Sequence, residues 1–321
     1  MDFQIVFMVI GFCLAAYSVV GNDAIQTLGT FLSSNRDRPW WMLWLWIAAL
    51  LILVLGLGWY TSSTGDASFG RLETIPSPPR VSWIYIIPPL AILVLTRFGI
   101  PVSTTFLLLT IFAPGNLMAM LTKSLLGYFV AFIVAILLYR FVINKTTRYL
   151  NRTHGEDHSK WWVILQWFST GFLWSQWLMQ DLANVFVFLP RSVSPRWMLF
   201  AVIIFVITLA FLFQKQGGTI QRIVTSKTGT TDIRGATIID FIYGIILLVF
   251  KEWSNIPMST TWVFLGLLAG REFAISLLLY SPPVNETAHL IRSDVTKALL
   301  GLVVSIIAAV LLPQLDKLIG F

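Results

Sequence analysis

Long runs with almost no charged residue constrain the fold of this chain most strongly. Each run is close to the ~20 apolar residues that cross a bilayer as an α-helix. Only 12% of the residues are charged, whereas soluble proteins carry about 25%, so charge cannot cover a surface that faces water. The sequence therefore predicts an all-α, multi-pass membrane protein whose main surroundings are the lipid bilayer. The four clearest runs are Trp41–Tyr60, Ser124–Val142, Trp197–Phe213 and Thr296–Leu312.

Hydropathy, proline, glycine and charge together divide the chain into two halves of five membrane-level segments each. The only strongly polar stretch between them is residues 144–160. We therefore expect a first transmembrane repeat at 1–143, a polar cytoplasmic linker at 144–160 and a second transmembrane repeat at 161–321. The expected segments are 3–20, 40–60, 82–98, 101–121 and 124–143, then 161–189, 197–214, 236–252, 257–280 and 295–313.

Three short motifs recur in the same order in both halves. PVSTT at 101–105 returns as PMSTT at 257–261, and TKSLLG at 122–127 returns as TKALLG at 296–301. Trp-Met-Leu, which begins at Trp41, returns at Trp197. Because each half has an odd number of segments, the second half enters the membrane from the opposite side. This is the inverted repeat of many secondary transporters.

Lys and Arg are more numerous in the loops on the side of the linker. The positive-inside rule then places the linker in the cytoplasm and both termini outside. We expect an integral multi-pass protein of a bacterial inner (plasma) membrane. The net charge of +7 is spread over loops, so we expect no nucleic-acid partner.

Each half also carries an acidic motif at the level of the membrane. Asn22 and Asp23 are followed by Gln26, and Gln180 and Asp181 are followed by Asn184. In both halves an amide precedes the Asp, and another follows it three residues later on the same helical face. Polar residues at this depth are costly, so they are by default functional.

The repeated Pro-x-Ser-Thr-Thr reads as a helix start. Proline suits the first turn of a helix, and Ser or Thr caps its free N–H groups. The positive end of a helix is also a site for anions. Two such starts could cradle one small oxyanion, while the carboxylates and amides offer oxygen ligands to Na⁺ or a place for a proton. The alternative is that the hydroxyls bond only to carbonyls of their own or a neighbouring helix.

These motifs together resemble the inorganic phosphate transporter (PiT) family, of which the chain looks like a divergent, short member. The resemblance implies re-entrant hairpins at the midplane, symport of inorganic phosphate with Na⁺ or H⁺, and a possible homodimer. It implies no cofactor other than the coupling ion, for which Asp23, Asp181, Asn22 and Asn184 would be ligands. The implied substrate-binding residues are Asn22, Asp23, Gln26, Ser103, Thr104, Thr105, Gln180, Asp181, Asn184, Ser259, Thr260 and Thr261.

The sequence departs from that family where a histidine usually follows each Ser-Thr-Thr, because Phe106 and Trp262 stand there. Sulfate or another small oxyanion is therefore an alternative substrate, and a non-transporting anion sensor is an alternative function. We expect no enzyme, because two matched sets of Asp and Ser-Thr-Thr favour one pseudo-symmetric site over a directional catalytic array.

Overall fold

The computed structural model describes residues 3–98, 100, 102–140, 160–217, 233–253, 256–279 and 284–319. These residues form helices and no β-strand, which confirms the predicted all-α class. The longer helices are α1 (Phe3–Val19), α2 (Ile25–Ser34), α3 (Trp40–Thr61), α4 (Ile87–Arg97), α6 (Leu117–Leu138), α8 (Lys160–Asp181), α10 (Pro195–Gln214), α12 (Ile233–Trp253), α13 (Thr260–Leu279) and α14 (Val284–Ile319). The short elements are η1 (Val20–Ala24), η2 (Leu72–Thr74), η3 (Trp83–Ile86), η4 (Thr105–Leu109), α5 (Thr110–Phe112), η5 (Pro114–Asn116) and α9 (Ala183–Phe186).

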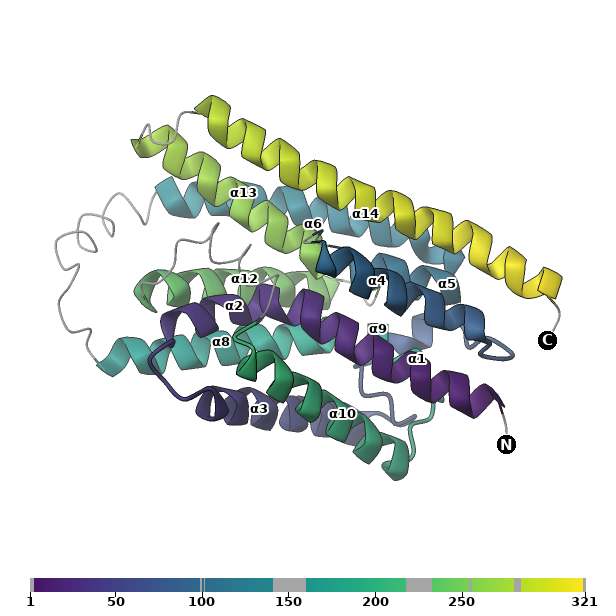
Figure 1. The fold of residues 1–321 in the computed structure, drawn as a ribbon. Helices are drawn as coiled ribbons and strands as arrows, with labels where there is room; N and C mark the ends of the chain where they lie inside the picture. The colour runs from purple at the N-terminus through teal and green to yellow at the C-terminus, as the bar shows by residue number, and fades with distance from the viewer. Residues whose placement is uncertain are drawn as a thin grey trace.

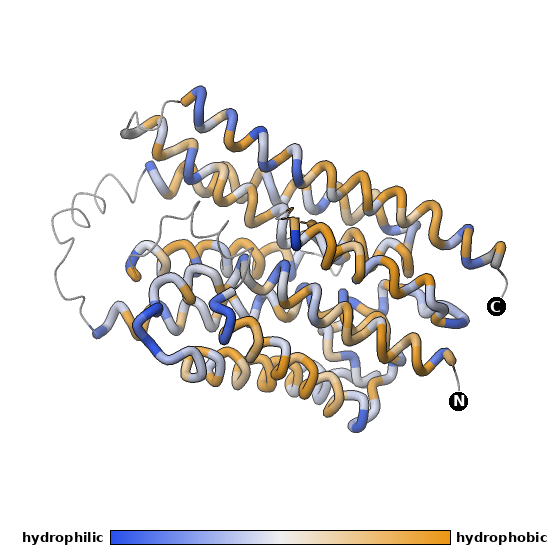
Figure 2. The backbone as a smooth tube through the Cα atoms, viewed as in Figure 1, coloured by the Kyte–Doolittle hydropathy of each residue, from blue (hydrophilic) through white to orange (hydrophobic). Residues whose placement is uncertain are grey.

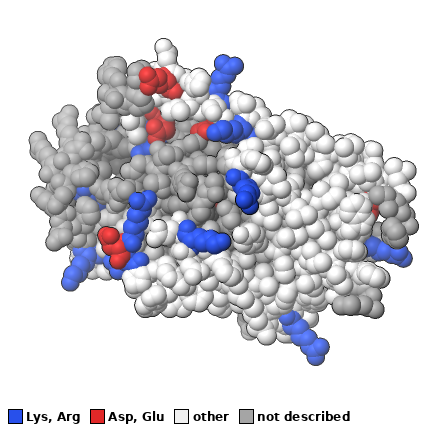
Figure 3. All heavy atoms as spheres, viewed as in Figure 1, with Lys and Arg blue, Asp and Glu red and all other residues white. Residues whose placement is uncertain are grey.

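Six of the described helical segments are long and apolar enough to cross a membrane. Their outward side chains are largely aliphatic or aromatic, and Figure 2 shows long orange stretches along α3, α10 and α14. Figure 3 shows a broad surface with few charged side chains, most of which gather toward one end of the molecule. The chain is therefore an integral membrane protein. The six segments are Phe3–Ala24, Trp40–Thr61, Pro114–Leu138, Pro195–Gln214, Ile233–Trp253 and Val284–Asp316.

The helices lie roughly side by side (Figure 1). The start of α1 and the end of α14 lie at one end of the molecule. The end of α6 and the start of α8 lie at the other. The predicted linker falls almost wholly on residues 141–159, which lie outside the described residues.

The structure differs from the expected segment at 101–121. A short helical stretch ends at Phe112, and the long helix α6 begins at Leu117. The break follows from Pro114, because a residue that precedes proline is disfavoured in the α conformation. Ala113 accordingly has φ −139° and ψ 65°. α14 differs from the expected segment at 295–313 as well, since it begins at Val284 and ends at Ile319.

Helix α13 packs closely against α6, and two glycines permit this approach. A Cβ atom on Gly266 would collide with the backbone carbonyl oxygen of Tyr128. One on Gly270 would collide with that of Phe132. The spacing Gly-x-x-x-Gly is the small-residue pattern that lets membrane helices bring their backbones together. The start of α13, which carries the second Ser-Thr-Thr, is thereby held against the first half of the chain.

Candidate functional site: two carboxylates and two Ser-Thr-Thr turns

The first carboxylate lies in η1, a π-helical turn between α1 and α2. Asp23 Oδ1 accepts hydrogen bonds from Asn22 Nδ2 (2.6 Å) and Gln26 Nε2 (3.4 Å). Asp23 Oδ2 accepts a hydrogen bond from the hydroxyl of Thr104. Asn22 Nδ2 also donates to the carbonyl oxygen of Val102 (2.6 Å). The first acidic motif and the first Ser-Thr-Thr turn therefore meet. Single π turns inside helices often occur at functional positions.

The second carboxylate ends α8, and its neighbours repeat most of this arrangement. Asp181 Oδ1 accepts a hydrogen bond from Asn184 Nδ2 (2.8 Å), and Oδ2 accepts one from Thr260 Oγ1 (2.7 Å). Gln180 behaves differently from Asn22. Its Nε2 donates to the carbonyl oxygen of Leu247 on α12 (2.6 Å). The Gln180 amide is therefore used in a contact with α12, whereas the Asn22 amide donates to the neighbouring carboxylate.

The second threonine of each turn crosses to the carboxylate of the other half. Thr105 Oγ1 lies 3.3 Å from Asp181 Oδ1, and Thr261 Oγ1 lies 3.3 Å from Asp23 Oδ1. Each of these hydroxyls also reaches a carbonyl of the opposite turn: Thr105 that of Met258 (3.2 Å) and Thr261 that of Val102 (3.4 Å). Each turn therefore contacts both carboxylates.

The amides that follow the carboxylates also join the two halves. Gln26 Nε2 donates to Thr261 Oγ1 (3.3 Å). Asn184 Nδ2 donates to Thr104 Oγ1 (3.1 Å) and Thr105 Oγ1 (3.2 Å). The predicted threonines, carboxylates and amides thus form one hydrogen-bonded cluster, from which Gln180 turns away.

The two serines cap the helices that start at the turns. Ser103 Oγ accepts a hydrogen bond from the backbone N–H of Phe106 (3.2 Å), and Ser259 Oγ accepts one from that of Trp262 (3.3 Å). This contact from a residue to the N–H three positions later is the usual N-cap arrangement. Both predicted helix starts are therefore present. Pro257 precedes the second, whereas Pro101 lies outside the described residues.

The cluster is closed off from solvent and has oxygen atoms to spare. Asp23 is 1% exposed and Asp181 0%. Three buried amide oxygens have no hydrogen-bond partner among the described residues: Gln26 Oε1, Gln180 Oε1 and Asn184 Oδ1. Asn22 Oδ1, in contrast, accepts a hydrogen bond from Thr96 (3.3 Å). Unpaired buried oxygens next to carboxylates are the kind of ligand that a hard cation takes.

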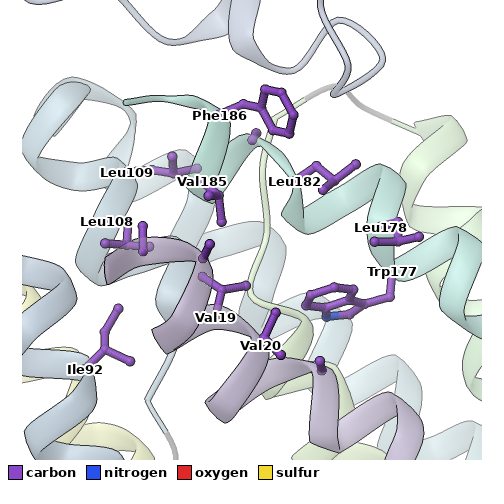
Figure 4. Close-up of a cluster of buried hydrophobic side chains, with 14 of the residues drawn as sticks. Val19, Val20, Ile92, Leu108, Leu109, Trp177, Leu178, Leu182, Val185 and Phe186 are labelled. Atoms are coloured by element: carbon purple, nitrogen blue, oxygen red, sulfur yellow. The ribbon is translucent and has the colours of Figure 1, made fainter. Parts of the chain in front are cut away.

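An apolar layer contributed by both halves packs beside the elements that carry the cluster (Figure 4). It joins the end of α1, η4, the end of α8 and α9, and its side chains are almost fully buried. Such packing keeps water away, and hydrogen bonds are electrostatically stronger in a dry interior. The layer includes Val19, Val20, Ile92, Leu108, Leu109, Trp177, Leu178, Leu182, Val185 and Phe186.

Phe106 and Trp262, which follow the two Ser-Thr-Thr motifs, contact each other. The rings of Phe106 and Trp262 meet edge to face, with centroids 6.4 Å apart. Phe106 is 0% exposed and Trp262 5%. The two helix starts are therefore joined by an aromatic contact immediately after their threonines.

A third buried carboxylate, which the sequence analysis missed, lies on α12. Asp240 is 1% exposed and ties three helices together. Its Oδ1 accepts a hydrogen bond from Thr30 of α2 (2.5 Å), and its Oδ2 accepts bonds from Gln166 (3.0 Å) and Thr170 (2.6 Å) of α8. The sequence did offer a signal for this site: Asp240 is an acidic residue inside the apolar run that precedes Lys251, and acidic residues within a membrane segment are rare.

Comparison with known proteins gives one informative match. No protein-family model matches the sequence, and no curated protein does. Among solved structures, the fold is similar to that of a sodium-dependent phosphate transporter, with a TM-score of 0.68 and 15% sequence identity over 99% of this chain and 100% of that chain. Along nearly its whole length, the chain thus has the fold of that transporter.

Proposed function

We propose that this chain is a secondary transporter that carries inorganic phosphate across the membrane together with Na⁺ or H⁺. The observation that carries the proposal is the pair of crossed contacts, from Thr105 to Asp181 and from Thr261 to Asp23. They bring both Ser-Thr-Thr turns and both carboxylates to one buried place. The fold shared with a sodium-dependent phosphate transporter supports the same function.

The matched contacts also support an inverted repeat. In each half the first threonine donates to the carboxylate of its own half, and the second donates to the carboxylate of the other. We propose that the halves are related by a pseudo-two-fold axis in the membrane plane. Alternating access would then come from movement of one part of the repeat against the other around this site.

Phosphate needs hydrogen-bond donors, and the four threonines supply them. Each hydroxyl has a single proton, which in the structure is directed to a carboxylate, and Thr105 and Thr261 share theirs with a backbone carbonyl of the opposite turn. An oxyanion can receive these protons only if something else satisfies the carboxylates. The helix starts add first-turn N–H groups with no partner inside their own helices.

A cation on the carboxylates would release those hydroxyls and offset the charge of the anion. Asp23, Asp181 and the unpaired oxygens of Gln26 and Asn184 are the best-placed ligands. Asn22, also a predicted ligand, already receives a hydrogen bond from Thr96. We therefore propose that cation binding precedes tight phosphate binding. The homodimer and the orientation in the membrane remain predictions.

Uptake by the purified protein in proteoliposomes tests the function. Labelled phosphate and sulfate are each supplied with an inward Na⁺ gradient, an inward H⁺ gradient or none. Phosphate should accumulate only with one of the cation gradients, and an ionophore for that cation should abolish accumulation. Preferential uptake of sulfate would reject phosphate as substrate. Cation-independent binding without uptake would reject the symporter in favour of an anion sensor.

A further inference from the structure

An arginine outside the predicted site has a buried guanidinium with spare donors. Arg71 lies between α3 and η3 and is 1% exposed. Its Nη1 donates to the carbonyl oxygen of Met179 (2.8 Å), two residues before Asp181. Its Nε and Nη2 are buried and have no hydrogen-bond partner among the described residues. Such donors are costly to leave unpaired, because burial strips them of water.

The segment around Arg71 is held in place by its own hydrogen bonds. Asp66 Oδ1 accepts hydrogen bonds from the backbone N–H (2.7 Å) and hydroxyl (2.6 Å) of Ser68, and Oδ2 accepts one from the N–H of Gly70 (3.0 Å). Ser68 Oγ in turn accepts the N–H of Leu72 (3.1 Å). The turn requires φ +83° at Gly70, a conformation that favours glycine. The guanidinium is therefore pre-positioned.

The two unpaired groups lie on the same edge of the guanidinium. Nε–H and one Nη2–H point in parallel, and this fork matches two oxygens of a phosphate or carboxylate. Burial lowers the pKa of Arg71 to about 10, against the effect of nearby carboxylates that include Asp181. The side chain is consequently charged at neutral pH.

A second buried cation lies within electrostatic range. Lys123 is 6% exposed, and its charge interacts with that of Arg71. Lys123 Nζ donates to the carbonyl oxygen of Ile256, just before the second Ser-Thr-Thr turn (2.8 Å). Repulsion between two buried cations is relieved when an anion binds near them. Arg71 and Lys123 thus make this side of the site favourable for negative charge.

We propose that the free edge of Arg71 is an oxyanion subsite that receives two oxygens of a tetrahedral oxyanion beside Asp181. The inference rests on the proposed function, because it concerns the same class of substrate. It adds a charged, bidentate donor to a cluster in which the sequence predicted only hydroxyls, amides and carboxylates. Arg71 would contribute to the affinity for the anion.

Thermal unfolding of the full-length protein in detergent, titrated with inorganic phosphate at fixed Na⁺, tests the subsite. Arg71→Lys keeps the charge and a donor for Met179 but removes the fork. We expect an unfolding temperature close to wild type without phosphate, and a half-saturating phosphate concentration raised at least about tenfold. Arg71→Gln, which keeps a donor but no charge, should show at least as large a loss. Any rise in unfolding temperature that Na⁺ alone produces in the wild type should remain in both variants.

Arg191 provides a matched control, because all three of its guanidinium nitrogens are used by the protein. It donates to the carbonyl oxygens of Ile75 (3.3 Å), Val187 (2.9 Å) and Pro76 (3.0 Å). Arg191→Lys should lower the unfolding temperature without phosphate but leave the half-saturating concentration unchanged. If folded Arg71→Lys or Arg71→Gln binds phosphate like wild type, the subsite is wrong while the transporter stands. If wild type responds to neither phosphate nor sulfate, both proposals fall.

Discussion

The hydroxyl of Thr261 donates to the carboxylate of Asp23, 238 positions earlier in the chain. The corresponding bond of the first turn runs from Thr105 to Asp181. Each of these threonines shares its proton with a backbone carbonyl of the opposite turn. A cation that changed the charge of one carboxylate would therefore affect both helix starts. This connection would be the physical basis for the proposed coupling of cation and anion binding.

Removing the crossing hydroxyls should weaken phosphate binding. Valine has nearly the shape of threonine, so Thr105→Val and Thr261→Val delete one donor each with little change in packing. Hydrogen bonds to charged groups contribute about 1.5–3 kcal/mol, so each variant should raise the half-saturating phosphate concentration by about tenfold or more. The measurement is the initial rate of phosphate uptake into proteoliposomes, at a saturating inward gradient of whichever cation, Na⁺ or H⁺, drives uptake by the wild type.

Thr110 supplies the control for these two variants. It is equally buried, but its hydroxyl donates to the carbonyl oxygen of Phe106 in its own helical stretch. Thr110→Val should therefore leave the half-saturating concentration within about twofold of wild type, because back-bonds of this kind contribute little. Equal losses in all three variants would show that packing, rather than the crossing hydroxyls, sets the affinity.

Neutralising either carboxylate should abolish coupled uptake. Asp23→Asn and Asp181→Asn keep the size of the side chain but remove the charge that would hold the cation. We expect folded proteins that show no uptake driven by a cation gradient and, if Na⁺ is the coupling ion, an unfolding temperature that no longer rises with Na⁺. Asp316→Asn is the control, since Asp316 lies near the end of α14, away from both Ser-Thr-Thr turns, and accepts a hydrogen bond from Ser82 (2.6 Å). Normal coupled transport by either variant would remove that Asp from the site.

Much of this arrangement could be predicted because its signals are local or repeated. Apolar runs of membrane length predicted the helical class. The two Pro-x-Ser-Thr-Thr motifs predicted helix starts, which the caps at Ser103 and Ser259 confirm. We also expected both Ser-Thr-Thr turns to lie near both acidic motifs, because we assumed that the two halves form one site. The crossed pattern itself could not be derived, because motif spacing does not tell which threonine faces which carboxylate.

The rest depended on distances that a sequence does not contain. Gln180 matches Asn22 in position, but its longer side chain reaches a carbonyl of α12 instead of the neighbouring carboxylate. Arg71 stands in an irregular segment that gives no periodic signal, and it becomes notable only through the burial of its unpaired nitrogens. The partners of Asp240 come from two other helices. In each case tertiary packing decides which polar group meets which.

Asp240 should stabilise the fold by linking α12 to α2 and α8, so that its replacement lowers the free energy of unfolding. Asp240→Leu leaves three buried donors, on Thr30, Gln166 and Thr170, without their acceptor. A buried polar group without a partner costs about 1–3 kcal/mol, so the unfolding temperature should fall by several degrees. Asp240→Asn keeps one acceptor oxygen and should lose less. If Asp240→Leu is as stable as wild type but transports without a cation gradient, the carboxylate belongs to the coupling machinery instead.

Gly266, where α13 comes close to the backbone of α6, should tolerate no larger residue. A methyl group at Gly266 would run into the backbone of Tyr128, which cannot yield as the tip of a side chain could. Gly266→Ala should therefore separate the two helices and destabilise the protein by about 1–3 kcal/mol. Because α13 begins at the second Ser-Thr-Thr turn, phosphate affinity should fall in the same variant.

Gly56→Ala on α3 is the control for Gly266→Ala, because a Cβ atom at Gly56 meets no atom within 4 Å. Alanine also favours a helix over glycine. The unfolding temperature of Gly56→Ala should therefore equal or exceed that of the wild type. Similar unfolding temperatures for the two variants would mean that the backbones of α6 and α13 do not approach as closely as described.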